Sequence, residues 1–258
     1  MYKNDKKTNL FIILGAFFIT NAIVAEFIGA KIFSLENTFG IKKFDLNILG
    51  FEHLSFELTC GVIVWPVVFI MTDIINEYYG KKGVKLLSYL ASIMISYAFI
   101  IVFAAIGTSP ADWWVKSGTA KNIDNMQYAY HAIFGQGLWI IAGSLVAFLV
   151  GQLIDVKIFH YLKLKSGEKY LWLRSTGSTV VSQLVDSFVV LFIAFYIGNN
   201  WSMSQVLAIG LMNYFYKLVI GILLTPLLYI IHNIIDNYLG KDLAHRMMKE
   251  ADGTYESN

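Results

Sequence analysis

The sequence predicts an all-α protein, a polytopic membrane bundle of six transmembrane helices. Three observations support this prediction. Hydrophobic residues make up 57% of the 258 positions and charged residues only 15%, whereas soluble domains have about 45–50% and about 25%. Six apolar stretches are each long enough to cross a hydrocarbon core about 30 Å thick. Finally, lysine and arginine gather in alternate connections between these stretches.

The six stretches follow one another closely enough to form a single bundle. Strands are a poor alternative, because a strand that crosses lipid singly leaves its backbone N–H and C=O groups unpaired. The bundle forms one predicted domain over residues 1–239, and residues 240–258 form a charged cytoplasmic tail. The predicted helices are Leu10–Ile32, Cys60–Tyr79, Lys85–Ile106, Ile133–Phe159, Thr176–Ile197 and Gln205–Ile231.

The basic residues predict the orientation, because cytoplasmic connections carry an excess of lysine and arginine. The N-terminal tail, the turn after the second helix, the connection after the fourth helix and the C-terminal tail hold 14 of the 20 basic residues. In a bundle of six helices these four segments lie on one side. Both chain termini are therefore predicted to be cytoplasmic, in a protein of the cell membrane, or of the inner membrane where a cell has two.

The composition and the motifs argue against several functions. A net charge of +2 gives no reason to expect a nucleic-acid partner. The sequence lacks a His-Glu-x-x-His zinc motif, a Gly-x-Ser-x-Gly nucleophile turn and a phosphate-binding Gly-Lys-Ser/Thr loop,. We therefore expect no cofactor, no metal and no ATP hydrolysis by this chain. A membrane-embedded hydrolase that pairs Asp73 with Asp155 remains an alternative.

Polar side chains inside the predicted helices are the candidate functional residues, since ionisable groups within the membrane are costly and usually functional. Counting from the helix ends places them in two layers. The central layer, near the bilayer midplane, contains Asn21, Gln183, Asp186, Asn213 and Lys217. The inner layer, nearer the cytoplasm, contains Asp73, Glu77, Gln152 and Asp155. All of these except Glu77 are candidate substrate-binding residues.

The fifth predicted helix carries a polar face. Thr179, Ser182, Gln183 and Asp186 are spaced i, i+3, i+4 and i+7 and so lie on one side of the helix,. Such a face must point into the bundle rather than at lipid. Asp186 and Lys217 have opposite charges at similar depth. Two interpretations remain open: an ion pair that only neutralises two costly charges, or a part of a substrate or proton pathway.

Other residues favour packing or solvation. Gly143, Ala147 and Gly151 recur at every fourth position of the fourth helix and predict a close approach to a neighbouring helix,. Glu77 is interpreted as a solvated carboxylate at a helix end. Glu26 either reaches the outer interface or lies inside the bundle.

The connections outside the helices carry weaker signals. Residues Ser34–Thr59 alternate weakly between apolar and polar and predict a short hairpin on the outer side. Residues Pro110–Tyr130 are polar and predict an irregular outer loop. The tail from Gly240 is charged, and we expect it to fray.

Four of these stretches resemble the queuosine precursor transporter family, also called the vitamin-uptake-transporter-like family. They are Thr-Asp-Ile-Ile-Asn-Glu-Tyr-Tyr-Gly at Thr72–Gly80, Gly-Gln-Leu-Ile-Asp-Val-Lys-Ile-Phe at Gly151–Phe159, Ser-Thr-Val-Val-Ser-Gln-Leu-Val-Asp-Ser at Ser178–Ser187, and Phe-Tyr-Lys ending at Lys217. Asn21 and Lys31 also resemble the family's first helix. The outer segment Ser34–Thr59 is longer than the family pattern leads us to expect.

The resemblance implies import of queuosine precursors, which are 7-deazaguanine bases with a nitrile or an aminomethyl group. The residues are chemically compatible with such a substrate. One carboxylate can accept both adjacent donors of a guanine-like edge, and Gln183, Asn213 and Asn21 can meet its other polar atoms. Tyr214, Phe215 or Tyr216 can stack on the base,. A cationic aminomethyl group would favour a further acid, such as Asp73 or Asp155.

The expected partners are therefore the substrate and the lipid bilayer, with a homo-oligomer left open. The alternative within transport is a vitamin-capture subunit that needs a separate ATPase module.

Overall fold

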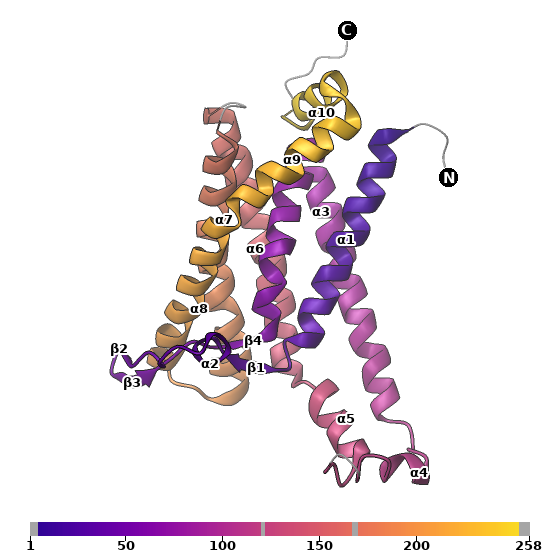
Figure 1. The fold of residues 1–258 in the computed structure, drawn as a ribbon, viewed down its shortest axis with the longest axis vertical. Coiled ribbons are helices and arrows are strands. Elements are labelled where there is room, and N and C mark those ends of the chain that lie inside the picture. The colour runs from indigo at the N-terminus through magenta and orange to yellow at the C-terminus, as the bar shows by residue number, and fades with distance from the viewer. Residues whose placement is uncertain (1–4, 120–121, 167–169, 253–258) are drawn as a thin grey trace.

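The computed structural model describes residues 5–119, 122–166 and 170–252. Long helices run side by side, and α1 (Lys6–Ile28) begins at the end of the bundle where α10 (Lys241–Asp252) lies (Figure 1). Within these described residues, five helical stretches are long and apolar enough to cross a membrane. They are Lys6–Ile28, Trp65–Ile106, Met126–Ser166, Leu171–Ile197 and Met203–Leu223. The predicted all-α membrane bundle is confirmed.

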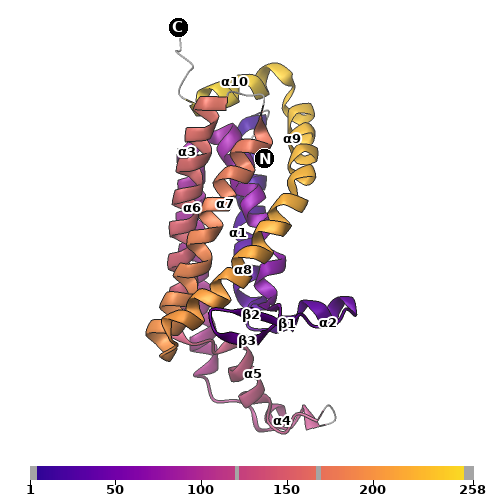
Figure 2. The same cartoon turned by 90° about the vertical axis from the view of Figure 1, so that its left-hand side faces the viewer.

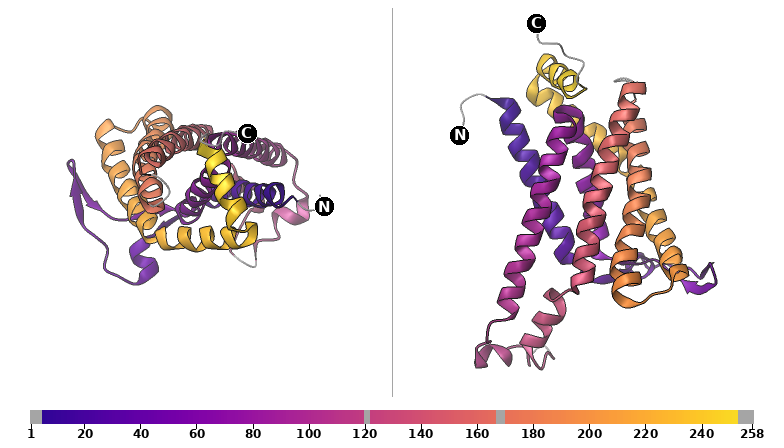
Figure 3. Two further views of the ribbon diagram at one scale, coloured as in Figure 1. Left: turned by 90° about the horizontal axis from the view of Figure 1, so that it is seen from above. Right: turned by 180° about the vertical axis from the view of Figure 1, so that it is seen from behind.

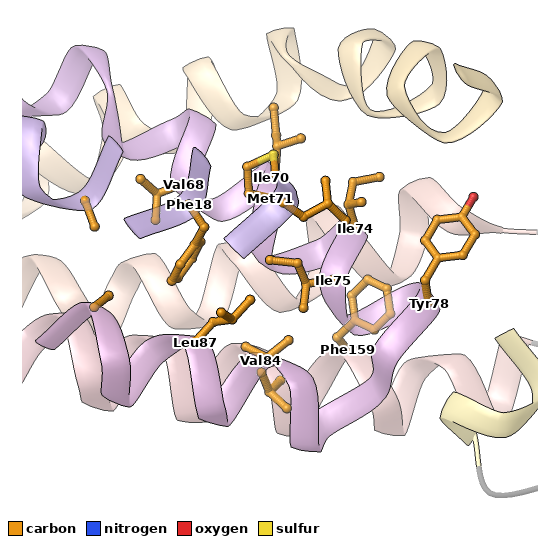
Figure 4. Packing of buried hydrophobic residues seen from close by; sticks show 14 of the residues in the cluster. Phe18, Val68, Ile70, Met71, Ile74, Ile75, Tyr78, Val84, Leu87 and Phe159 are labelled. Carbon is orange, nitrogen blue, oxygen red and sulfur yellow. The ribbon is translucent and has the colours of Figure 1, made fainter. Parts of the chain in front are cut away.

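Helix α3 (Trp65–Ile106) folds back on itself at Gly80, which has φ 65° and ψ −170°. In a straight helix, Ile75 and Gly83 would lie about 12 Å apart along the axis. Instead, a methyl group on Gly83 would lie 3.6 Å from Ile75 Cγ2, and Figure 4 shows Val84 and Leu87 beside Ile75. The stretch therefore consists of two antiparallel arms, divided where the sequence predicted a turn between two helices. The count of six membrane crossings and the cytoplasmic side stay predictions.

The remaining long helices complete the bundle. Helix α6 (Leu138–Ser166) is followed by α7 (Leu171–Leu191), which continues into the π-helical turn η3 (Phe192–Ile197). Next come α8 (Met203–Leu223) and α9 (Thr225–Leu239). The apolar core unites α1 with both arms of α3, α6 and the C-terminal helices, and Figure 4 shows part of it. Large apolar side chains such as Ile13, Ile93 and Ile100 are exposed on the outside, as expected for helices surrounded by lipid.

Helices α6 and α7 approach each other closely along the predicted stripe of small residues. A methyl group on Gly143 would lie 3.1 Å from the Val190 carbonyl oxygen, and one on Gly151 would lie 3.5 Å from Asp186 Cβ. Ala147, which lies between these two glycines in the sequence, is fully buried. The predicted close approach is confirmed, and it brings the polar face of α7 against α6.

The outer segment between α1 and α3 contains more structure than one hairpin. Strand β1 (Ile32–Ser34) pairs antiparallel with β4 (Glu57–Thr59), and β2 (Leu46–Ile48) pairs antiparallel with β3 (Phe51–Leu54). The short helix α2 (Leu35–Phe39) follows β1, and the 3-10 turn η1 (Cys60–Ile63) follows β4. The segment lies beside α8, toward the end of the bundle away from α10 (Figure 2). Its side chains Phe56 and Leu58 pack with Met212 of α8.

Two expectations about where helices begin and end were wrong. The stretch Pro110–Tyr130 contains α4 (Asp112–Val115) and the start of α5 (Met126–Phe134) rather than an irregular loop throughout. The sixth predicted helix, Gln205–Ile231, is divided at Leu224, because Pro226 in the first turn of α9 lacks the backbone N–H that would continue the preceding helix,.

The tail is also helical over residues 241–252, since Ala244 and Met247 of α10 are buried in the core. Figure 3 shows α10 crossing over the end of the bundle at which α1 begins. Residues 253–258 lie outside the described part of the chain. The division of the chain at residue 240 stays a prediction.

Candidate functional site

A cavity of about 470 Å³ opens among α1, α6, α7, α8 and the outer segment. We call it the outer cavity. This volume lies within the range of about 300–1,000 Å³ that is usual for small-molecule sites. On the side of the outer segment, its lining includes the apolar residues Ile32 and Val62 and the polar residue Thr59. Its polar lining residues include Glu26, Gln136, Ser144, Asp186, Asn213 and Lys217.

A second and much smaller space, the inner pocket, lies between the first arm of α3, α7, α8 and α9. Asp73, Thr179, Gln183 and Lys217 are among its lining residues. Its volume of about 30 Å³ has room for very little more than water,. A base-sized molecule therefore fits in the outer cavity and not in the inner pocket in this conformation. Lys217 lines both spaces.

The ion pair between α7 and α8 lies at this boundary. Lys217 Nζ donates to Asp186 Oδ2 over 2.5 Å, and the two side chains are only 11% and 16% exposed. The predicted contact between these residues is therefore present. A low dielectric strengthens the attraction but makes each charge expensive alone, so the two charges depend on each other.

Buried hydroxyl groups hold the inner-layer side chains in the helix interfaces. Ser175 Oγ donates to Asp73 Oδ2, which joins α7 to α3. Thr72 Oγ1 donates to Gln152 Oε1 over 2.8 Å, which joins α3 to α6. In addition, the hydroxyl group on Ser182 of α7 donates to the Asp155 carboxylate of α6 over 3.0 Å.

The predicted site residues fall into groups according to the space that each one lines. Asp186, Asn213 and Lys217 line the outer cavity, and Asp73, Gln183 and Lys217 line the inner pocket. Gln152 and Asp155 are fully buried and line neither space.

The structure does not bring Asn21 into either group. Its amide donates to the Phe17 carbonyl oxygen of its own helix over 2.8 Å, and it lines neither of the two spaces.

A buried ionic cluster, which was not predicted from the sequence, lies close to the reversal point of α3 at Gly80. Arg174 of α7 donates to Glu77 of α3 through two nitrogens, over 2.6 and 3.2 Å, and Lys163 Nζ lies 3.3 Å from the same carboxylate. All three side chains are at most 3% exposed. The expectation of a solvated Glu77 was wrong, because two basic groups from other helices cover it.

A signal for this cluster was present in the sequence. Arg174, Ser178 and Ser182 are spaced i, i+4 and i+8, so the buried polar face of α7 extends to the arginine,. Arg174 was instead counted among the basic residues of the cytoplasmic connection after the fourth predicted helix.

Glu26 lies inside the bundle, which decides between its two interpretations. It is 7% exposed. Ser144 Oγ of α6 donates to Glu26 Oε2 over 2.7 Å, and the Gln136 amide donates to the Glu26 backbone carbonyl over 3.1 Å. Among the residues that the structure describes, none form a group of three or more metal-binding side chains.

Comparison with known proteins gives consistent results. Residues 59–248 match a family model described as a putative vitamin uptake transporter. A probable queuosine precursor transporter of Bacillus subtilis (strain 168) is 29% identical over 191 residues, which cover 72% of this chain and 76% of that protein. No solved structure matches the chain.

Two further relatives carry similar names. A probable queuosine precursor transporter of Haemophilus influenzae is 26% identical over 184 residues, which cover 69% of this chain and 70% of the relative. The queuosine precursor transporter of Escherichia coli (strain K12) is 25% identical over 173 residues, which cover 66% and 70% of the two chains. Because the family model matches most of the sequence, the chain belongs to the putative vitamin uptake transporter family and is a multi-pass transporter of the cell membrane rather than an enzyme.

Proposed function

We propose that the protein imports queuosine precursors, 7-deazaguanine bases that the cell salvages to modify its transfer RNA. The outer cavity is the observation that carries this proposal. It is large enough for such a base, and Asp186, Asn213 and Lys217 supply acceptors and donors along one wall. The relatives named for queuosine precursors support the choice of substrate.

The polar wall complements a guanine-like base. The Lys217 ammonium group donates to a ring carbonyl oxygen, and the Asn213 amide both donates and accepts. Asp186 accepts from ring N–H groups with the acceptor sites that Lys217 leaves unused,. The base thus binds beside an ion pair that has one residue on α7 and one on α8.

Passage inward then requires the inner pocket to open. Asp73 and Gln183 line this pocket with Lys217, so they are the next polar groups that a base meets. We assign to the inner layer the role of a gate or a proton route. Its fully buried members Gln152 and Asp155 hold helix interfaces through hydroxyl contacts.

The alternatives receive less support. Asp155 lines neither cavity, whereas a hydrolase that pairs it with Asp73 needs both carboxylates to reach substrate and water. For the capture subunit, the relatives' names mention no ATPase module. Uptake by the purified protein in vesicles without ATP would separate a lone importer from a capture subunit.

The decisive experiment is rescue of queuosine in transfer RNA, in cells that cannot make the precursor, at limiting external precursor. The unmodified protein should restore queuosine. Asp186→Asn should lower uptake at least tenfold per molecule of protein in the membrane, or about 1.4 kcal/mol of transition-state binding.

The matched control is Asp112→Asn, the same chemical change at an exposed position of α4, which should restore queuosine fully. Failure of the unmodified protein at every precursor concentration would exclude the function. Full rescue by Asp186→Asn would remove only this residue from the site.

A further inference from the structure

Glu26 is a buried carboxylate in the wall of the outer cavity, and no basic group among the described residues forms an ion pair with it. It belongs to α1 and is 7% exposed. Its Oε2 accepts the Ser144 hydroxyl group, and its Oε1 has no hydrogen-bond partner among the described residues. Because almost all buried polar atoms in proteins are hydrogen-bonded, an unpaired carboxylate oxygen here requires an explanation.

The charges of the outer cavity do not balance. In the described part of the chain, its lining contains two carboxylates, Glu26 and Asp186, and one basic group, Lys217. Lys217 is already bound to Asp186 over 2.5 Å. With the carboxylates ionised, the cavity therefore has a formal charge of −1, and this charge lies at Glu26. A buried carboxylate without a counter-charge is costly, so a ligand that supplies a positive charge gains binding free energy there.

The other carboxylates with an unpaired oxygen are less suitable for a ligand. Asp73 Oδ1 and Asp155 Oδ2 also lack partners among the described residues. Asp73, however, faces the inner pocket of about 30 Å³, and Asp155 lines neither space. Of these three carboxylates with an unpaired oxygen, Glu26 is the one that lines a cavity large enough for a ligand.

We propose that Glu26 binds an alkylammonium group of the transported molecule and so makes the importer selective for a cationic substrate. This inference rests on the proposed function and deepens it. Of the two precursor types, the nitrile base is neutral and the aminomethyl base carries an ammonium group at neutral pH. The second type supplies the missing positive charge, and the first leaves Glu26 uncompensated.

The positions of the helices suit a ligand with two polar ends. Glu26 lies on α1, and the Asp186–Lys217 pair lies on α7 and α8, across the bundle from α1 (Figure 1). The ring of an aminomethyl base would contact the pair while its ammonium group reaches Glu26. An ammonium group has three donors, and rotation of the carboxylate about its last bond can present either oxygen while Ser144 keeps the other.

Competition binding to the purified protein tests this inference, with the aminomethyl and the nitrile base as a matched pair of probes at one pH. The unmodified protein should bind the aminomethyl base at least tenfold more tightly. Glu26→Gln should abolish this preference by weakening the aminomethyl base alone. Glu52→Gln is the control, because it makes the same chemical change at an exposed position of β3 outside the cavity, so the preference should persist. Glu26→Asp keeps the charge and should preserve the preference.

The ratio of the two affinities separates a binding role from a structural one, since loss of packing would weaken both ligands equally. Equal affinities in the unmodified protein would overturn the inference even if Glu26→Gln failed to fold. An unchanged ratio in Glu26→Gln would overturn it as well. If the unmodified protein bound neither base, the proposed function would fail, and this inference with it.

Discussion

Lys217 Nζ lies 2.5 Å from Asp186 Oδ2, and Lys217 is also the residue shared by the outer cavity and the inner pocket. One ion pair thus separates a space that admits a ligand from one that does not. The proposed route from the outer cavity to the inner pocket passes this contact.

The first prediction concerns the stability of this pair. Lys217→Met leaves Asp186 uncompensated, and removal of one partner of a buried pair costs roughly 3–5 kcal/mol. We therefore expect a lower unfolding temperature in detergent for Lys217→Met. The double variant with Asp186→Leu should recover much of the loss, because no lone charge remains. Unchanged unfolding temperatures in both single variants would show that the pair contributes nothing to stability.

The second prediction concerns Arg174, which donates two hydrogen bonds to the Glu77 carboxylate through two nitrogens. Arg174→Lys keeps the charge but loses the planar fork that binds both oxygens. One lost charge-assisted hydrogen bond corresponds to about 1.5–3 kcal/mol, so the unfolding temperature in detergent should fall. Arg246→Lys, the same change at an exposed site of α10, should leave it unchanged. Equal behaviour of the two variants would contradict the importance of the fork.

The third prediction is the orientation in the membrane. Single cysteines would be introduced in a Cys60→Ser background, at Asn199 beyond η3 and at Ser166 at the end of α6. A membrane-impermeant maleimide added outside intact cells should label the cysteine at Asn199 and not the one at Ser166. The reverse pattern would place both termini outside.

The fourth prediction concerns acid and the outer segment. Burial by itself raises the pKa of Glu36, but the Phe56 backbone N–H at 2.8 Å and the Ser34 hydroxyl group at 3.2 Å outweigh it and hold the pKa below its ordinary value. The fold thus favours the charged form. This stabilisation is complete above the unfolded pKa of about 4.3 and is lost as the pH falls through the lower folded pKa.

Hydrogen exchange of residues 34–59 checks this, after correction for intrinsic rates. Protection in the unmodified protein should be constant from pH 7 to pH 5 and should decline at pH 3. In Glu36→Gln, which resembles the protonated acid, it should already be reduced at pH 7 and should not change further with acid. A similar decline at pH 3 in both proteins would assign the acid sensitivity to other groups.

The sequence was sufficient for features that depend on the residues of one helix. The stretch Thr179–Asp186 shows its buried face through its spacing, and Gly80 separates the two arms of α3 where basic residues predicted a turn. The order of apolar stretches followed from hydrophobicity alone, since lipid leaves few other solutions. One contact between two helices was also anticipated, because the ion pair of Asp186 with Lys217 was one of the two interpretations that their opposite charges and similar depth favoured.

Features that depend on several helices were not predictable in this way. Lys163 and Arg174 were counted among the basic residues of a cytoplasmic connection, because their burial depends on Glu77, which approaches them from α3. The place of Glu26 depends in the same way on Ser144 of α6. The shape of the outer cavity arises only when the outer segment covers α8, and no spacing along the chain encodes that contact.

The contact between α10 and the turn of α3 has a consequence for how the protein is made. A methyl group on Gly80 would lie 2.8 Å from the Ala251 backbone oxygen, so the reversal point of α3 is covered by α10, which follows all the other described helices in the chain. The hairpin is therefore synthesised before the helix that covers its turn. Until α10 has been made and has packed against Gly80, this end of the bundle lacks its cover.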